Sequence, residues 1–270
     1  MELIDQVINV IHKEKYWGYS VEYYLSSINK CTPSYAAHFY NKHMLSIEQV
    51  AELLGMIDDE KKNSFDKVYA EELYLEYNAN KYADDSSFIE NMKKIFDNKR
   101  VLIIAPGKKI LEKREEINEL LKAEDVISIS LNNLEYSTDY LMVTRADFID
   151  EAVKSNSRII MSSHIARGKY ENVSIIDYRN WIIKGEKTYD SAGVMSLNMM
   201  RNTNVKEILL AGFDGFSVDI NNNYYDKSLR RPVSDEQAYT RNEFYRNMIQ
   251  DISKEKKIRF ITTSLYQEVN

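Results

Sequence analysis

The residues best suited to chemistry in this chain stand where short apolar runs end. Pro106, Gly107 and Lys108 follow the apolar run 101–105 and precede a helical pattern. A Pro-Gly turn in that place offers backbone N–H groups and an ammonium, a combination suited to a phosphate. The turn is neither a G-x-G-x-x-G nor a Walker sequence, so the alternative is a simple turn without a ligand.

Two further runs end in polar side chains. Asn132 and Asn133 follow the run 126–131, and their carboxamides can bind a base or ribose edge or cap the next element. Thr144 and Arg145 follow the run 140–143. A guanidinium there can pair with a phosphate, or it can be exposed to solvent.

The fourth group surrounds an apolar helical stretch. Ser191, Ala192 and Gly193 precede that stretch, which predicts a buried helix whose amino-terminal N–H groups form an anion site. Asp214 follows the run 207–211. Its carboxylate could hold a ribose hydroxyl, orient a catalytic group or cap a turn, which makes it a weak catalytic candidate.

No familiar catalytic set accompanies these groups. The four histidines lack metal-ligand spacing, so we expect no metal site. A G-x-S-x-G elbow and paired carboxylates are also missing from the sequence. The sequence names no nucleophile. The histidines are His12, His38, His43 and His164.

The elements that position these groups alternate between strand and helix patterns after residue 98. Short β-branched runs predict strands at 101–105, 126–131, 140–143, 158–162, 173–176, 207–211 and 259–261. Helical spacing predicts helices at about 110–122, 147–155, 192–202 and 235–254. This alternation predicts an α/β fold with a Rossmann-like, mainly parallel sheet and helices on both faces. The long polar stretch 217–232 is a candidate lid or specificity loop.

The chain ahead of this region has a different pattern. Apolar residues recur at three and four residues up to about residue 97, which predicts a helical segment without strands. The sequence therefore predicts two domains, a helical domain at 1–97 and an α/β domain at 98–270. Residues 97–100 are the expected hinge between them.

Composition narrows the classes of function. The net charge is −6, and residues 1–97 hold 17 Asp and Glu against 10 Lys and Arg. An acidic half without a basic stripe elsewhere disfavours nucleic-acid binding. No run reaches the roughly 20 apolar residues of a membrane span, and the first residues are acidic where a signal peptide is basic. Together with the single cysteine, Cys31, these features predict a cytoplasmic protein.

The whole chain resembles the carboxy-terminal region of bacterial aldolase-fusion proteins whose barrel is similar to 4-hydroxy-2-oxovalerate aldolase. The resemblance rests on residues 16–20, 23–35, 71–77, 103–108 and 126–132. The barrel itself is absent, with its D-R-E and H-x-H metal motifs, and Thr32 stands where the group has histidine. The resemblance implies that residues 1–97 bind an aldolase barrel as a partner and that the chain does not cleave carbon–carbon bonds alone. Self-association into a homo-oligomer is left open.

Residues 100–265 resemble bacterial sialyltransferases that use CMP-sialic acid and related Rossmann-like proteins. The shared order is a Pro-Gly turn, a strand ending in Asn, a Ser-x-Gly-Val helix start and a Lys-Glu-Ile-x-Leu-x-Gly-x-Asp strand. The resemblance implies that a CMP-type nucleotide or nucleotide sugar is held by Gly107, Asn132, Ser191 and Gly193. It also implies a tyrosine that contacts the leaving phosphate, matched by Tyr224 or Tyr225, of which Tyr225 is a weak catalytic candidate.

One departure limits the expected activity. The transferases have a general-base histidine in the lid region, and residues 217–250 contain none. The expected function is therefore nucleotide or nucleotide-sugar binding by a transferase-like domain associated with an aldolase in carbohydrate or surface-polysaccharide metabolism, with turnover left open. The alternative is a non-catalytic partner or scaffold module of such an aldolase.

Overall fold

The computed structural model describes residues 84–145, 148–163, 165–166, 170–183, 191–229 and 233–267 of the 270. The helices expected ahead of residue 84 lie outside these ranges. The chain divides into two compact units, which are described separately. The first comprises Ser86–Met142, Ser155–Ile159 and Asp190–Asn270, and the second includes Asp85, Val143–Lys154 and Ile160–Tyr189.

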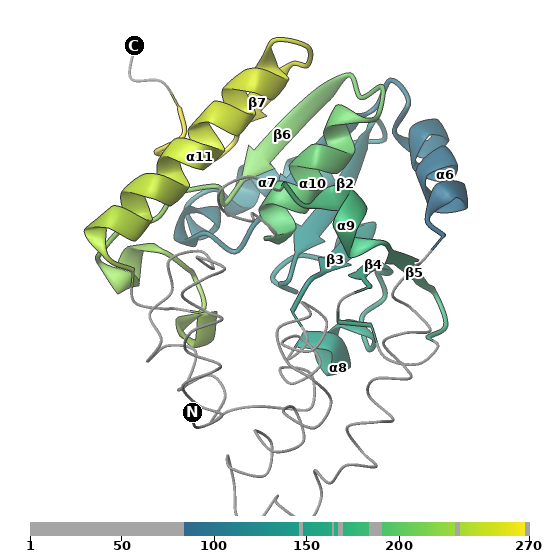
Figure 1. Ribbon diagram of the computed structural model, residues 1–270, viewed down its shortest axis with the longest axis horizontal. Coiled ribbons are helices and arrows are strands. Elements are labelled where there is room, and N and C mark those ends of the chain that lie inside the picture. The colour runs from purple at the N-terminus through teal and green to yellow at the C-terminus, as the bar shows by residue number, and fades with distance from the viewer. Residues whose placement is uncertain are drawn as a thin grey trace, which may run out of the picture. The chain divides into compact units, whose positions relative to one another are not determined.

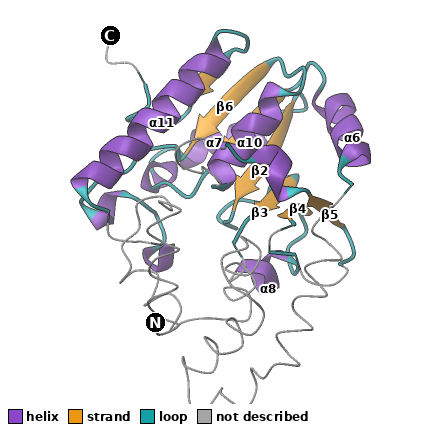
Figure 2. Cartoon of the chain, viewed as in Figure 1, coloured by secondary structure: helices purple, strands orange, loops and turns teal. Residues whose placement is uncertain are grey.

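Seven strands form one sheet in the order β5-β4-β3-β2-β1-β6-β7 (Figures 1 and 2). The pairs β1·β2, β1·β6, β2·β3 and β6·β7 are all parallel. The expected Rossmann-like α/β fold is therefore confirmed. The strands are β1 (Arg100–Ile104), β2 (Val126–Leu131), β3 (Tyr140–Val143), β4 (Arg158–Ser162), β5 (Val173–Ile176), β6 (Glu207–Ala211) and β7 (Ile258–Phe260).

The helices follow the expected positions with shorter bounds. The helix expected at 110–122 is split into a 3-10 turn and α7, and the one expected at 147–155 is reduced to the four residues of α8. The helical elements are α6 (Ser86–Phe96), η1 (Lys108–Leu111), α7 (Arg114–Leu121), α8 (Ile149–Ala152), α9 (Tyr178–Trp181), α10 (Ala192–Arg201), η3 (Ile220–Asn222), η4 (Lys227–Leu229) and α11 (Asp235–Ser253).

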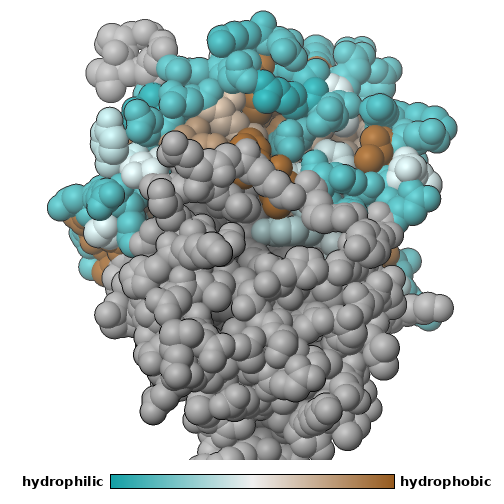
Figure 3. Space-filling model, in the orientation of Figure 1, coloured by the Kyte–Doolittle hydropathy of each residue, from teal (hydrophilic) through white to brown (hydrophobic). Residues whose placement is uncertain are grey.

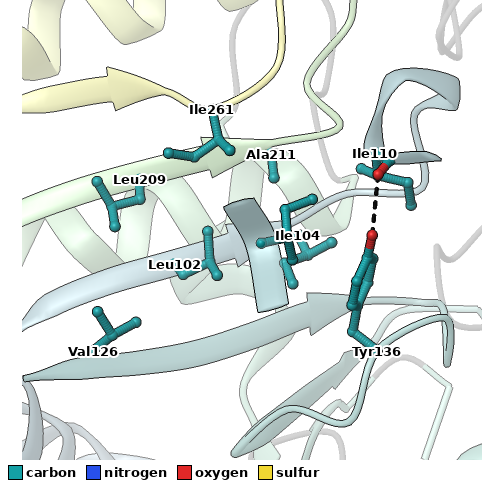
Figure 4. Packing of buried hydrophobic residues seen from close by; sticks show 9 residues of the cluster. Leu102, Ile104, Ile110, Val126, Tyr136, Leu209, Ala211 and Ile261 are labelled. Carbon is teal, nitrogen blue, oxygen red and sulfur yellow. Dashed lines mark hydrogen bonds between the residues drawn. The ribbon is translucent and has the colours of Figure 1, made fainter. Parts of the chain in front are cut away.

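Both faces of the central strand β1 are covered. Its alternating side chains point to opposite faces, yet residues 101–104 are all completely buried. Leu102 and Ile104 pack with Ile117 of α7 in one cluster, part of which Figure 4 shows. In Figure 1, α10 and α11 lie in front of the sheet and α7 lies behind it. The continuous apolar run of β1 is what a strand buried on both faces requires.

Helix α6 belongs to the first unit, together with strands β1, β2, β6 and β7. Its Phe96 is completely buried, and the Phe96 ring meets Tyr140 of β3 edge to face at 5.9 Å. The expected hinge is held in place, because Asn98 N–H donates to Asn204 O at 2.8 Å and Lys206 N–H donates to Lys99 O at 2.8 Å. The separate helical domain predicted ahead of the sheet remains a prediction, because the chain before residue 84 lies outside the described ranges.

In the second unit, a buried carboxylate organises a helix that the sequence did not predict. Asp85 accepts hydrogen bonds from Trp181 Nε1 at 2.8 Å and from Asp177 N–H at 3.2 Å. Asn180 Nδ2 donates to it at 3.2 Å. These donors come from the short helix α9 and the residue before it, so Asp85 fixes the start of that helix.

The described surface is mainly hydrophilic on the face drawn in Figure 3. Among the described residues, no helix is long and apolar enough to cross a membrane.

Candidate functional site

The strand order reverses between β1 and β6. From β1 the chain builds the sheet outward through β2 to β5, then returns to place β6 and β7 on the other side of β1. In open α/β sheets, ligands bind outside the carboxyl ends of the strands at this switch point. The turns after β1 and β6 contain Gly107, Lys108 and Asp214, so the fold brings these three predicted residues to the expected place.

Gly107 packs against the turn that follows β6. A Cβ atom added to Gly107 would lie 2.2 Å from Gly212 O and 2.7 Å from the carboxylate carbon of Asp214. The two turns are therefore in direct contact, and only glycine fits between them. This contact explains Gly107 by packing, whereas the sequence suggested close approach to a phosphate.

The Asp214 carboxylate is itself an anion held by the turn after β1. Its Oδ2 accepts a hydrogen bond from Lys109 N–H at 2.7 Å, and its Oδ1 accepts one from Thr262 Oγ1 at 3.3 Å. The side chain is buried. Burial raises the pKa of Asp214 above its ordinary value, while the Lys109 N–H and the Lys109 charge oppose that rise. Asp214 thus accepts from a backbone N–H group of the turn where the sequence predicted a bound ligand.

Lys108 is free of such contacts. Among the described residues, neither its backbone N–H nor its Nζ has a hydrogen-bond or ion-pair partner. The side chain is half-buried. By contrast, the neighbouring Lys109 Nζ donates to Thr263 O at 3.2 Å. Within the described part of the chain, Lys108 is therefore a cation at the switch point that can meet an anionic ligand.

Asn132 and Asn133 have different roles after β2. Asn132 has φ 49°, a left-handed conformation that Asn tolerates, and it turns the chain away from the strand. Asn133 is buried, and its Nδ2 donates to Ile104 O at 3.1 Å and to Leu131 O at 3.0 Å. These two acceptors fix the orientation of the amide, so Oδ1 points away from them. Asn133 Oδ1 is buried and has no hydrogen-bond partner in the part of the chain that the structure describes.

The start of α10 is covered by a tyrosine. Ser191 caps the helix by accepting from Val194 N–H at 3.2 Å, and Ala192 and Gly193 are buried in the first turn. The hydroxyls of Ser191 and Tyr245 are hydrogen-bonded to each other. A Cβ atom on Gly193 would lie 2.6 Å from the Tyr245 hydroxyl oxygen. The Tyr245 hydroxyl therefore lies beside the first turn of α10, where the anion site was predicted.

Tyr245 belongs to an aromatic cluster that sequence reasoning missed. Its ring stacks on Tyr266 with centroids 5.0 Å apart and meets the Phe213 ring at 6.3 Å. Burial raises the pKa of Tyr266 well above its ordinary value, and Tyr245 adds to the rise. Arg241 is also buried and lies 5.0 Å from the centroid of the Phe216 ring. The helical spacing of Arg241 and Tyr245 on α11, four residues apart, was the available signal.

The candidate lid reaches the first turn. Tyr225 N–H donates to Pro106 O at 3.2 Å, and its side chain packs beside the cluster of Figure 4. Two 3-10 helices, η3 and η4, lie in this stretch, so its described part has local structure of its own. The structure therefore brings Tyr225 beside the switch point.

Thr144 follows β3, belongs to the second unit and is half-buried. Its position relative to the residues of the first unit is therefore not described. In the ranges that the structure describes, no group of three or more His, Cys, Asp or Glu side chains could hold a metal ion.

Comparisons with known proteins leave the family of this chain open. No family model and no curated protein sequence matches it. Function must therefore be argued from the switch point and the groups that stand around it.

Proposed function

We propose that the α/β unit binds a nucleotide or nucleotide sugar at the carboxyl ends of β1, β2 and β6. The ligand class follows from the resemblance to CMP-sialic-acid-using transferases. One observation carries the proposal: the strand order reverses between β1 and β6, and the unengaged ammonium of Lys108 stands at that reversal. In this proposal, Lys108 pairs with a phosphate oxygen of the ligand.

Asn133 supports the same location. Among the described residues its buried Oδ1 has no donor, and such a group costs about 1–3 kcal/mol when it stays unsatisfied. A ribose hydroxyl or a base amino group that reaches this edge would supply the donor. Because Oδ1 is enclosed, the proposal requires neighbouring side chains to shift when the ligand binds.

The wider role is a transferase-like domain of carbohydrate or surface-polysaccharide metabolism that works with an aldolase through residues 1–97. Catalysis is not assigned to a residue. Asp214 is engaged by Lys109 N–H and Thr262, so in this proposal it shapes the site and does not act as a base.

The binding test is calorimetric titration of the full chain with CMP, CDP, UDP and their sugars. Lys108→Ala should weaken binding about tenfold or more, because a hydrogen bond to a charged group is lost. Lys122→Ala is the matched control, since Lys122 is exposed at the far end of α7. Silence across the panel from well-folded wild-type protein would reject nucleotide binding, and equal effects of the two variants would move the phosphate elsewhere.

A non-catalytic partner module of an aldolase is the second candidate. It is favoured by the protein's own groups at two predicted anion positions: Asp214 accepts from Lys109 N–H after β1, and the Tyr245 hydroxyl lies beside the first turn of α10. Co-purification of a barrel aldolase with the chain, together with silence in the nucleotide panel, would support this function over the first.

A further inference from the structure

Three exposed apolar side chains come from segments that meet along one side of α11. Val218 lies in the stretch after β6, Tyr239 lies in the first half of α11, and Leu265 lies after β7. Their exposed fractions are 53%, 66% and 49%. We call these three residues the α11 patch. Exposed apolar side chains that gather on one surface mark a site for another molecule, whereas single ones are ordinary.

An asparagine of α11 holds the first of these segments beside the helix. Asn242 lies one turn after Tyr239. Its Oδ1 accepts from Phe216 N–H at 2.7 Å, and its Nδ2 donates to Phe216 O at 2.8 Å. Val218 follows two residues later, so the two hydrogen bonds hold it near the same part of the helix.

The second segment is held one turn further along α11. Arg246 Nη2 donates to Leu265 O at 2.9 Å, and Leu265 N–H donates to Asp214 O at 2.9 Å. A Cβ atom on Gly215 would lie 2.7 Å from Leu265 Cβ, so this side chain lies against the turn after β6. The α11 patch is therefore preformed, which reduces the conformational entropy that a partner loses on binding.

Carboxylates border the α11 patch. Asp219 comes directly after its first residue, and Glu236 and Glu243 lie three residues before and four residues after Tyr239. All three carboxylates are exposed, and none has an ion-pair partner among the described residues. By contrast, Asp251 near the end of the same helix is paired with an arginine and a lysine. The border of the patch is thus negative and available to cations of a partner.

We propose that the α11 patch docks a basic amphipathic segment of a partner protein. The apolar side chains of that segment contact the patch, and its Lys and Arg side chains pair with the three carboxylates. A second copy of this chain would bring the same three carboxylates against them, and an anionic lipid surface would be repelled. This interaction goes beyond nucleotide binding and does not depend on it.

The test is fluorescence anisotropy of the full chain with a labelled helical peptide of about 14 residues, whose leucines and lysines lie on opposite faces. Wild-type protein should bind this peptide. It should bind neither a peptide with glutamate in place of lysine nor a scrambled peptide of the same composition at the same concentrations.

Two double variants separate the apolar and the charged contributions. Val218→Ser with Tyr239→Ser should weaken binding about tenfold or more, because the apolar anchors are lost. Glu236→Gln with Glu243→Gln should weaken binding about fivefold and flatten its dependence on salt, because two exposed ion pairs are lost. Should the first double variant not fold, Tyr239→Ala decides the proposal, with an expected loss of about threefold.

The matched control changes one apolar and one charged residue elsewhere. Leu134 is 42% exposed on the loop after β2. Glu115 is exposed on α7, which lies behind the sheet (Figure 1). Leu134→Ser with Glu115→Gln should leave the affinity for the basic peptide unchanged.

Three results would overturn the proposal. The first is no binding of the basic peptide to folded wild-type chain, or equal binding of the acidic or scrambled peptide. The second is a loss in the control variant as large as that in the variants of the α11 patch. The third is dimerisation of the wild-type chain in sedimentation equilibrium that Val218→Ser with Tyr239→Ser abolishes, which would identify a second copy as the occupant.

Discussion

Polar groups are paired differently at the two ends of the parallel strands. The amino edge is the side of the sheet where the strands begin, and the carboxyl edge is the side where they end. At the amino edge, Arg100 is paired with Asp125, its Nε donating at 2.8 Å, and the buried Glu207 Oε1, which has no hydrogen-bond partner among the described residues, forms an ion pair with Lys257 Nζ at 2.9 Å. At the carboxyl edge, Lys108 Nζ has no partner among the described residues, and the buried Asn133 Oδ1 has no donor. Paired groups stabilise a fold, whereas groups left unsatisfied at a switch point are available to a ligand.

Substitution of Gly107, at the carboxyl edge, should have the largest effect on stability. Gly107→Ala forces a methyl group against Gly212 O, where a Cβ would lie at 2.2 Å, so the turns after β1 and β6 must separate. We expect a loss of about 3 kcal/mol in the free energy of unfolding. Urea denaturation measures it.

Gly193→Ala is the control for that change. Its new methyl group would meet the end of the Tyr245 side chain, which can move more easily than backbone. A smaller loss is expected, about 1 kcal/mol. Equal losses at the two glycines, or none at Gly107, would contradict the packing described for the switch point.

Asn133→Asp tests the carboxyl edge next. The carboxylate cannot donate to Ile104 O and Leu131 O, and it would place two acceptors against two carbonyl oxygens in a buried site. The expected loss is about 2 kcal/mol in the free energy of unfolding at neutral pH, recovered in part at low pH when the carboxyl is protonated. A variant as stable as wild type at neutral pH would show that Asn133 does not tie β1 to β2.

Asp214 gives a smaller effect that depends on pH. Its pKa is raised in the folded state, so between its unfolded and folded pKa values the folded protein binds more protons than the unfolded chain. The contribution of Asp214 to stability therefore falls as pH rises through that window. Asp214→Asn should remove this component, which thermal unfolding of wild type and variant from about pH 3.5 to pH 7 measures. Parallel curves for the two proteins would contradict the assignment.

The amino edge should give the smallest effect. The Asp125 side chain is about half-exposed, and its hydrogen bond with Arg100 lowers its pKa below the ordinary value. Arg100→Gln should return the Asp125 pKa toward that value, as an NMR titration of the carboxyl carbon reports. The change in stability should be slight and screened by salt. A loss of stability in Arg100→Gln larger than that in Asn133→Asp would contradict the proposed difference between the two edges.

The sequence predicted strands well where one local pattern decides the structure. The run 126–131 consists of Val, Ile and Leu residues with Ser128 and Ser130 among them, and β2 has those bounds. The expected helix at 110–122 was wrong in its first part, because the chain forms η1 and then begins α7 again at Arg114. The N–H of Lys109, at the start of η1, donates to Asp214, a residue of the distant β6 turn.

The candidate site was harder to predict for the same reason. Gly107, Asn132, Asn133 and Asp214 could be placed at strand ends from local pattern alone. The sequence could not show that Gly107 contacts the turn after β6, or that Tyr245 covers Gly193. Such contacts between distant segments depend on strand order and helix orientation, which periodicity does not specify. The roles of the predicted site residues toward a ligand remain predictions.

The central claim is that nucleotides bind at the carboxyl edge beside Lys108 and Asn133. It is tested most directly by two-dimensional amide NMR of the labelled protein during titration with CMP. The predicted result is that the backbone signals of Gly107 and Lys108 and the side-chain amide of Asn133 shift with one common affinity. Shifts confined to Arg100, Asp125 and Glu207 at the amino edge, or no shifts at saturating CMP, would contradict it.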